Sequence, residues 1–278
     1  MTDHSPASKR AKTAYFAGPK PRVLAHRGLS FVGSKSLIGD ATTPSIDENS
    51  IQAFLTAQEA GAQLIESDLQ VTKDGVAVLF HDDDLLRVAG IKRKVHDLNL
   101  AELQKITLEF GARIPTLREA LIALPGAKFN LDFKVSGVIE PAVRIIEELG
   151  AHERILVAGF SDRRRRRALR LLTKPVVTSA GPIAVLRLWL VAKLGNTKAV
   201  ARLANNLNAL QIPTHTGKIN LSSAKFIDAM HEVGLELHYW TINDPTQMLE
   251  LLRAGADGLV TDRADLAVEV VDRFRRFG

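Results

Sequence analysis

The chain lacks several features that mark common functional classes. It contains no cysteine, which excludes disulfides, thiolate metal ligands and cysteine nucleophiles. It has only two Trp and two Tyr, which argues against a surface that stacks nucleic-acid bases, and it shows no recognition module. No apolar run approaches the ~20 residues that span a bilayer, and the N-terminus lacks the apolar core of a secretory signal. We therefore expect a cytoplasmic protein with no nucleic-acid partner.

The residues that are present indicate a globular protein that favours anionic partners. Of 278 residues, 46% are hydrophobic, which is enough for a sizeable core, and the formal net charge is +6. Residues 1–20 are polar and show no periodicity, so we predict a flexible N-terminal tail there. Residues 21–278 show no shift in composition that would divide them, so we predict one domain.

Within this domain, short apolar runs alternate with amphipathic stretches. We predict eight strands, at residues 22–25, 64–69, 128–133, 155–159, 176–178, 208–212, 236–240 and 258–261. The periodicity predicts helices at residues 50–60, 117–124, 141–149, 162–172, 182–207 with a break near Gly195, 223–233, 245–253 and 265–277. This alternation implies parallel strands joined by crossover helices. The expected fold is α/β, a single (β/α)8 TIM barrel.

One segment departs from the alternation. After the second strand, VTKDGVAVLFHDDD contains a turn at residues 73–75 between two alternating runs, which predicts an extra β-hairpin. Such a hairpin puts His81 opposite Glu66 and Leu79 opposite Asp68, to within about one residue of register. Because Glu66 and Asp68 are two residues apart on a strand, their side chains share one face. The hairpin thus returns a histidine to two carboxylates.

Chemically useful side chains stand at the predicted carboxyl ends of the strands, which line the active face of a barrel. The first strand ends in His26 and Arg27, and Asp132 ends the third. Glu66, Asp68 and Asp132 are a hard oxygen set suited to Ca²⁺ or Mg²⁺. His26 and His81 can divide the roles of general base and general acid. These groups suggest displacement at phosphorus.

Four side chains are candidates for substrate binding: Arg27, Glu48, Lys134 and Trp240. Arg27 offers a fork for two phosphate oxygens, and Lys134 adds a point charge on the same strand face as Asp132. Trp240 is either barrel filling or a wall against the bound molecule, and its strand-end position favours the wall. Glu48 is either an ordinary helix N-terminal residue or a support for Arg27, for His26 or for the metal, and we favour the second interpretation.

The combined pattern resembles the glycerophosphodiester phosphodiesterase family over about residues 20–278. The matching motifs are His26-Arg27-Gly28, Glu48-Asn49-Ser50, Glu66-Ser67-Asp68, Thr72-Lys73-Asp74-Gly75, His81-Asp82, Asp132-Phe133-Lys134, Trp240-Thr241-Ile242-Asn243 and Asp257-Gly258-Leu259-Val260-Thr261-Asp262. The resemblance implies hydrolysis of glycerophosphodiesters to sn-glycerol 3-phosphate and an alcohol, with a divalent cation. It implies that His26 and His81 are the acid/base pair. It also implies attack by the glycerol 2-hydroxyl to give a cyclic phosphate, which water then opens.

Two departures from the family pattern bear on this expectation. Asp132 stands where the family usually has Glu, which shortens the third predicted metal ligand by one methylene. Residues 29–47 form a longer connection than the family's usual short loop, and we predict that they serve as a lid.

Two other functions remain open. The first is a lysophospholipase D that acts on membrane lysophospholipids, which is favoured if the apolar helix predicted from residue 182 lines the pocket mouth. The second is a catalytically silent binding barrel, against which the retained histidines and carboxylates argue. Separately, the arginines from Arg163 to Arg167 occupy the first turns of a predicted helix, where the dipole disfavours cations. They suggest peripheral contact with an anionic membrane, against the plainer interpretation of a solvated helix face.

Overall fold

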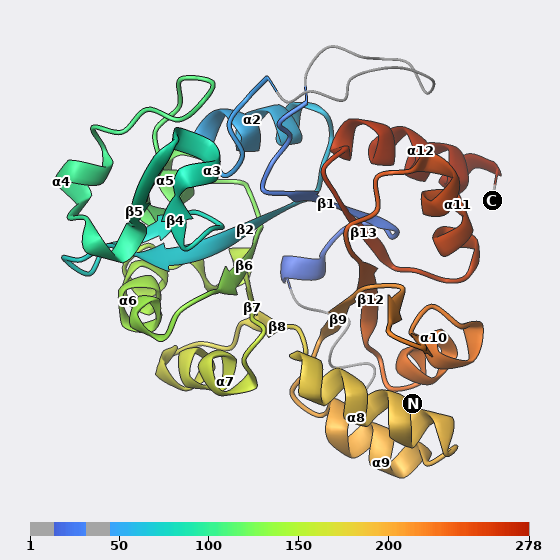
Figure 1. Ribbon diagram of the computed structural model, residues 1–278. Helices are drawn as coiled ribbons and strands as arrows, with labels where there is room; N and C mark the ends of the chain where they lie inside the picture. The colour runs from blue at the N-terminus through green and yellow to red at the C-terminus, as the bar shows by residue number, and fades with distance from the viewer. Residues whose placement is uncertain (1–13, 32–44, 278) are drawn as a thin grey trace.

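The computed structural model describes residues 14–31 and 45–277, and its centre is a ring of eight parallel strands (Figure 1). The strands are β1 (Arg22–His26), β2 (Leu64–Val71), β6 (Phe129–Phe133), β7 (Ile155–Ala158), β8 (Val177–Thr178), β9 (Ala209–Ile212), β12 (Glu236–Tyr239) and β13 (Gly258–Thr261). They pair in the order β8-β7-β6-β2-β1-β13-β12-β9. A parallel bridge between Ser179 and Ala209 joins the two ends of this order. The predicted TIM barrel is confirmed.

Helices surround the strands, as Figure 1 shows, and cover the outside of the ring. They are α2 (Ile51–Glu59), α5 (Leu117–Ala123), α6 (Ile139–Glu148), α7 (Asp162–Leu171), α8 (Pro182–Lys193), α9 (Thr197–Ala204), α10 (Ala224–His231), α11 (Pro245–Arg253) and α12 (Ala264–Phe277). Several begin at side-chain caps; the Ser50 side chain, for example, accepts a hydrogen bond from the backbone N–H of Ala53. The predicted break near Gly195 separates α8 from α9, and this glycine has a φ of +69°.

The extra hairpin is also present. Strand β3 (Ala77–Leu79) runs antiparallel to β2, and Leu79 pairs with Leu69, one residue from the predicted partner Asp68. The chain then forms a small layer that the sequence did not predict. It consists of β4 (Asp84–Leu85), α3 (Leu86–Ala89), β5 (Ile91–Lys94), the 3-10 helix η2 (Val95–Asp97) and α4 (Leu100–Leu103), around a separate apolar cluster that includes Val78, Val95 and Ile114. This layer is formed by the segment that follows His81 in the chain.

The predicted tail needs a correction at its carboxyl side. Residues Ala14–Phe16 form the 3-10 helix η1, the short blue helix inside the ring in Figure 1. Tyr15 and Phe16 are 1% and 5% exposed, and Arg22 at the start of β1 donates a hydrogen bond to the carbonyl of Phe16. These two aromatic residues therefore belong to the barrel core. The sequence did not reveal Tyr15 and Phe16 as core residues because an isolated pair shows no periodicity. The rest of the predicted tail up to residue 13 lies outside the described residues.

The same end of the barrel contains a buried polar network. Arg22 donates from Nε to Glu236 at 2.7 Å and from Nη2 to the same carboxylate at 2.9 Å. His238, which is fully buried, contacts Glu236 at 3.1 Å. The network and η1 fill the barrel at the amino ends of the strands, so the open end of the barrel is the carboxyl one.

Candidate active site

The turn after β1 positions the first candidate residues. Arg27 has a φ of +60° and Gly28 a φ of +86°. A Cβ on Gly28 would stand 2.7 Å from the backbone carbonyl carbon of Ala53 in α2, so only glycine fits this close approach. The sharp turn brings Arg27 back toward β2, where its backbone N–H donates to the carbonyl of Glu66 at 3.0 Å. The turn therefore holds Arg27 beside the carboxylates of β2.

Two histidines line one pocket at the carboxyl ends of the strands, and each is held by a carboxylate. Nδ1 of His26 lies 2.6 Å from Oδ1 of Asp262, and Nδ1 of His81 lies 2.6 Å from Oδ1 of Asp82. A carboxylate at Nδ1 places the proton of a neutral imidazole on that nitrogen. Nε2 of each ring is then left to exchange a proton, and Nε2 of His26 is 3.9 Å from Glu66.

The surroundings of His26 change its acidity. Burial lowers the pKa of His26, but the hydrogen bond to Asp262 and the charge of Glu66 outweigh burial, so the pKa lies above its ordinary value. Burial raises the pKa of Asp262, yet its bonds to His26 and Asn243 bring that pKa below its ordinary value. The pair is thus stabilised in its ionised form.

Three carboxylates lie beside the histidines on neighbouring strands. Glu66, Asp68 and Asp132 are all buried, and Asp68 is directly in register with Asp132 between β2 and β6. Nζ of Lys134 lies 2.9 Å from Asp68 and 3.1 Å from Asp132. Burial, followed by the charge of Asp68, raises the pKa of Glu66 to about 8. The cluster therefore holds more negative charge than its surroundings readily accommodate.

The donor chemistry of this cluster suits a hard divalent cation. Oδ1 of Asp132 is buried without a hydrogen-bond partner, which leaves an acceptor free for a ligand. Within residues 14–31 and 45–277, however, no three His, Asp or Glu side chains are arranged so that they could hold a metal ion as they stand. The ammonium group of Lys134 contacts one oxygen of Asp68 and one oxygen of Asp132, so a cation bound to both carboxylates would share them with this ammonium group.

A chain of ion pairs connects the two histidine segments through Glu48. Arg27 binds Glu48 at 3.0 Å, and Arg87 of α3 binds the same carboxylate at 2.5 Å. Arg87 also donates from Nε to Asp82 at 2.7 Å, and Asp82 holds His81. The structure therefore places Glu48 against Arg27 and Arg87, and Glu48 is not among the residues that line the pocket.

The sequence did not reveal several of the site residues. Asp262 follows β13 and was quoted only as part of a motif, although the strand-end rule that selected His26 applies to it equally. Asp82 was quoted only within the His81-Asp82 motif, but its bond to His81 places it in the site. Arg87 carried no signal in the sequence, because its role depends on the fold of the layer after β3. Asn49, with a φ of +55°, accepts from Ser67 and contacts Asp68 at 3.5 Å.

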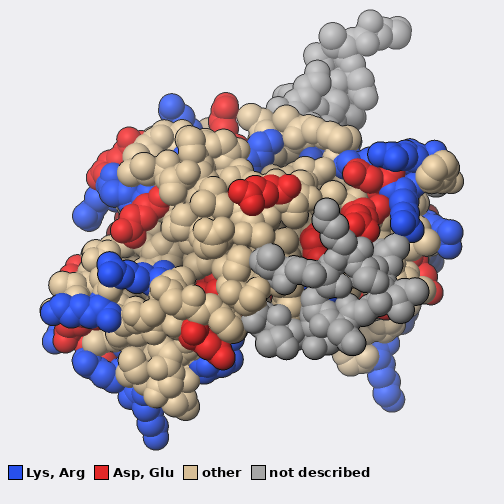
Figure 2. Space-filling view, turned by 90° about the horizontal axis from the view of Figure 1, so that it is seen from above, with Lys and Arg blue, Asp and Glu red and all other residues tan. Residues whose placement is uncertain are grey.

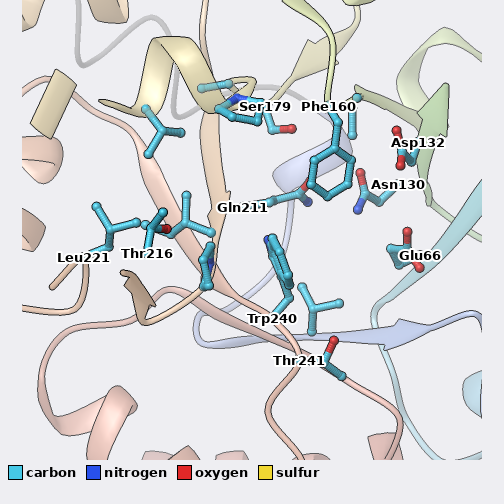
Figure 3. A pocket seen from close by; sticks show the side chains of 18 of the residues that line it. Glu66, Asn130, Asp132, Phe160, Ser179, Gln211, Thr216, Leu221, Trp240 and Thr241 are labelled. Carbon is cyan, nitrogen blue, oxygen red and sulfur yellow. The ribbon is translucent and has the colours of Figure 1, made fainter. Parts of the chain in front are cut away.

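The pocket has a volume of about 630 Å³ and extends well beyond the histidines. Figure 3 shows Trp240 and Phe160 between the carboxylates Glu66 and Asp132 on one side and Leu221 on the other. The Trp240 and Phe160 rings meet edge to face with centroids 6.0 Å apart. Trp240 thus lines the pocket. Residues 32–44, most of the predicted lid, lie outside the described residues.

The arginine run of α7 is not uniformly exposed. Arg165 is buried and contacts Asp162 and Thr178, and Arg164 donates to the carbonyl of Phe133. Arg163, Arg166 and Arg167 are exposed. On the face seen from above in Figure 2, basic side chains lie around the edge, with acidic ones among them. In the part of the chain that the structure describes, no helix is both long and apolar enough to cross a membrane.

Comparison with known proteins gives one consistent family. Residues 26–266 match the model of the "Glycerophosphoryl diester phosphodiesterase family". The chain is 39% identical over 249 residues to "Probable glycerophosphodiester phosphodiesterase 2" of Mycobacterium tuberculosis, with 89% of each chain covered. It is 33% identical over 102 residues to "Lysophospholipase D GDPD1" of Homo sapiens, which covers 32% of each chain.

Solved structures show the same fold. An Oleispira antarctica phosphodiesterase in complex with the product sn-glycerol-3-phosphate has a TM-score of 0.71 at 21% identity, with 94% of this chain and 100% of that chain covered. A glycerophosphodiester phosphodiesterase of Thermotoga maritima has a TM-score of 0.68 at 23% identity, with 91% and 99% covered.

Proposed function

The chain belongs to the glycerophosphoryl diester phosphodiesterase family, and we propose that its pocket hydrolyses glycerophosphodiesters to sn-glycerol 3-phosphate and an alcohol by two-histidine acid/base catalysis. The observation that carries this proposal is the pair of imidazoles, each with a carboxylate at Nδ1, that line one pocket with three acidic and two basic side chains. The retained pairs argue against a silent binding barrel.

In the proposed mechanism, one imidazole takes the proton of the glycerol 2-hydroxyl as its oxygen attacks phosphorus. The other imidazole gives a proton to the departing alcohol oxygen as the P–O bond to the alcohol breaks. A cyclic phosphate results, and water opens it while the two rings exchange roles. Arg27 and Lys134 are the cations that meet the phosphate oxygens. Nε of Arg27 is buried without a hydrogen-bond partner and lies 3.6 Å from Oδ2 of Asp68, which leaves this donor available to a phosphate oxygen.

A divalent cation, Ca²⁺ or Mg²⁺, is part of this proposal, with Glu66, Asp68 and Asp132 as its ligands. A bound cation would supply charge neutralisation at the phosphate oxygens. Two observations support a cation at this site. Oδ1 of Asp132 has no hydrogen-bond partner, and burial and the charge of Asp68 raise the pKa of Glu66, as expected for carboxylates with too little positive charge nearby. We expect activity to be lost after chelation and restored by one of the two ions, and Glu66→Gln to weaken the ion binding measured by calorimetry.

The test of the acid/base pair uses single glutamine variants. His26→Gln and His81→Gln should each lower turnover of glycerophosphocholine by about 10²- to 10⁴-fold, the usual contribution of a general acid or base. His96→Gln is the matched control, because this histidine is exposed and does not line the pocket. Activity that survives in either pocket variant at the level of the control would overturn the proposed roles.

We also propose a cytoplasmic protein with peripheral contact to an anionic membrane. Arg163, Arg166 and Arg167 are exposed on α7, and α8, which carries exposed apolar side chains, packs beside it. Each basic residue near an anionic surface contributes about 1 kcal/mol. Sedimentation with anionic liposomes at low salt should deplete the protein from solution, and neutral liposomes should not. Equal recovery in the supernatant with both lipids contradicts the contact.

A further inference from the structure

The 3-10 helix η1 reaches from the amino end of the barrel to the floor of the pocket. Tyr15 belongs to one buried apolar cluster with Ala158 and Val260, and Trp240 packs against this cluster. Ala158, Val260 and Trp240 also line the pocket. These three residues therefore have the pocket on one side and the cluster of Tyr15 on the other, so that η1 supports the pocket from inside the barrel.

Charged side chains fix η1 in this place. Lys128, which precedes β6, donates to the carbonyls of Ala14 and Ala17 at 2.7 and 3.3 Å. Arg22 of β1 donates to the carbonyl of Phe16 at 2.7 Å. A helix of three residues is too short to be stable by its own hydrogen bonds. The position of Tyr15 is therefore set by contacts with the barrel.

The two aromatic residues of η1 have different surroundings. The guanidinium carbon of Arg22 lies 4.9 Å from the centroid of the Phe16 ring. The Phe16 ring also meets His238 edge to face, with centroids 5.8 Å apart. Phe16 thus packs against the buried polar network at the amino end of the barrel.

The hydroxyl of Tyr15 lies between that network and the carboxylates of the pocket. It is buried and has no hydrogen-bond partner among the described residues. Burial raises the pKa of Tyr15, the charge of Arg22 lowers it, and the charges of Glu236 and Glu66 raise it further. Because both carboxylates act on the same hydroxyl, Tyr15 is close to the amino-end network and to the catalytic pocket at once.

Two side chains of the pocket also carry unpaired polar atoms. Oδ1 of Asn130 and Nε2 of Gln211 are buried, and neither has a partner in the part of the chain that the structure describes. Asn130 is 3% exposed and pairs with Glu66 between β2 and β6. In Figure 3 the side chains of Asn130 and Gln211 point toward one another, with η1, drawn in pale blue, behind them. One needs a donor and the other an acceptor, and a hydroxyl group or a water molecule supplies both.

We propose that Tyr15 is a positioning residue of the pocket, whose hydroxyl shares one buried water with Asn130 and Gln211 and so completes a hydrogen-bonded floor beside Glu66. A buried water typically makes about three hydrogen bonds to groups that are otherwise unpaired, and three such groups meet here. The floor holds the strand neighbour of Glu66, whose carboxylate lies 3.9 Å from Nε2 of His26. The inference rests on the proposed function, because turnover is one of its readouts.

The first test is Tyr15→Phe, which removes the hydroxyl and keeps the ring. The loss of one hydrogen bond should lower kcat for glycerophosphocholine by about 2- to 10-fold and raise the unfolding equilibrium constant by a similar factor. KM should stay unchanged, because Arg27 and Lys134 are untouched. If the hydroxyl has no partner in solution, Tyr15→Phe removes an unpaired buried group. The protein then becomes more stable at an unchanged kcat, and this result would overturn the proposal.

Phe16→Leu is the matched control. Phe16 belongs to the same helix and is also buried, but its ring packs against the amino-end network. The substitution should raise the unfolding equilibrium constant and leave both kcat and KM unchanged at a temperature where the protein is folded. An equal loss of kcat in Phe16→Leu and Tyr15→Phe would assign the effect to η1 as a whole and contradict the role of the Tyr15 hydroxyl.

A double-mutant cycle in urea tests whether Tyr15 and Asn130 share one set of hydrogen bonds. Tyr15→Phe and Asn130→Ala should each raise the unfolding equilibrium constant. Together they should fall short of the product of the two single effects by about 2- to 10-fold, because both break the same bonds. Phe16→Leu and Asn130→Ala should multiply. Independent effects of Tyr15→Phe and Asn130→Ala would contradict the shared floor.

The outcomes separate this inference from the proposed function. Cleavage by the wild type at a rate that Tyr15→Phe leaves intact would overturn the floor and keep the phosphodiesterase. No cleavage of glycerophosphocholine by the wild type, with either cation added, would contradict the proposed function itself. The cycle in urea needs no turnover, so it decides on the floor in that case too.

Discussion

Replacing Asp262 with Asn removes the carboxylate that lies 2.6 Å from Nδ1 of His26. A hydrogen bond to a charged group contributes about 1.5–3 kcal/mol. Because the Asp262 side chain is 35% exposed, water weakens the pair, and we expect the lower part of this range. About 1.5–2 kcal/mol corresponds to a loss of about 10- to 30-fold in kcat/KM. Asn243 holds the other oxygen of Asp262 at 2.8 Å, so the loop position should persist.

The pH profile tests the reason for this loss. In the wild type, Asp262 and Glu66 raise the pKa of His26 against the opposite effect of burial. In Asp262→Asn the contribution of Asp262 is gone, so the pKa of His26 falls. The limb of the turnover profile that His26 controls should then move to lower pH.

The assay is turnover of glycerophosphocholine from about pH 5 to about pH 9, the range in which imidazoles titrate. Asp97→Asn serves as the control, because His96 and Asp97 form a solvent-exposed pair at 3.6 Å away from the pocket. It should leave both the rate and the profile unchanged. A limb that stays in place or moves to higher pH in Asp262→Asn would refute the electrostatic reasoning, whatever the loss in rate.

Substitutions at three other positions test separate parts of the structure. Arg87→Gln should lower kcat by about 2- to 5-fold, because its half-exposed pairs orient His81 only indirectly, and Arg87→Lys should restore part of the rate. In EDTA, the folded protein keeps the proton on Glu66 up to about pH 8, whereas the unfolded chain loses it near pH 4.5. The unfolding free energy of the wild type should therefore fall by on the order of 3–5 kcal/mol as the pH rises from 4.5 to 8. Glu66→Gln should raise the melting temperature at pH 8 and leave it unchanged at pH 4.5. Glu236→Gln leaves Arg22 buried without its carboxylate and should cost about 3–5 kcal/mol of unfolding free energy at neutral pH. Arg22 and His238 lower the pKa of Glu236 in the folded protein, although burial acts in the opposite direction. The ionised Glu236 therefore stabilises the fold fully above pH 4.5, and this stabilisation is lost as the pH falls through the pKa of Glu236 in the folded protein. The loss of unfolding free energy in Glu236→Gln should therefore be smaller in acid.

The strand pattern was predictable because the barrel buries each strand on both sides. Continuous apolar runs such as ILVA in β7 and GLVT in β13 are typical of strands covered on both faces, and all eight predicted strands are present. The same logic placed His26 and Asp132 at the active face, since parallel strands in a closed barrel end together. Both line the pocket.

Contacts between distant segments escaped prediction because no local pattern encodes them. The layer after β3 decides that Arg87 reaches Asp82 and Glu48, and the last strand brings Asp262 to His26 across 236 residues of chain. Neither pairing leaves a periodic trace in the sequence.

By itself, the sequence determined the barrel, the identity of the acidic and imidazole groups and the end of the strands where they stand. These follow from local burial and side-chain alternation. Only the tertiary structure decided which carboxylate holds each histidine, how η1 closes the amino end, and that α8 lines a side of the pocket without charged residues. Such features depend on how helices and loops far apart in the chain pack against one another, and packing is settled by the shapes of all the partners together.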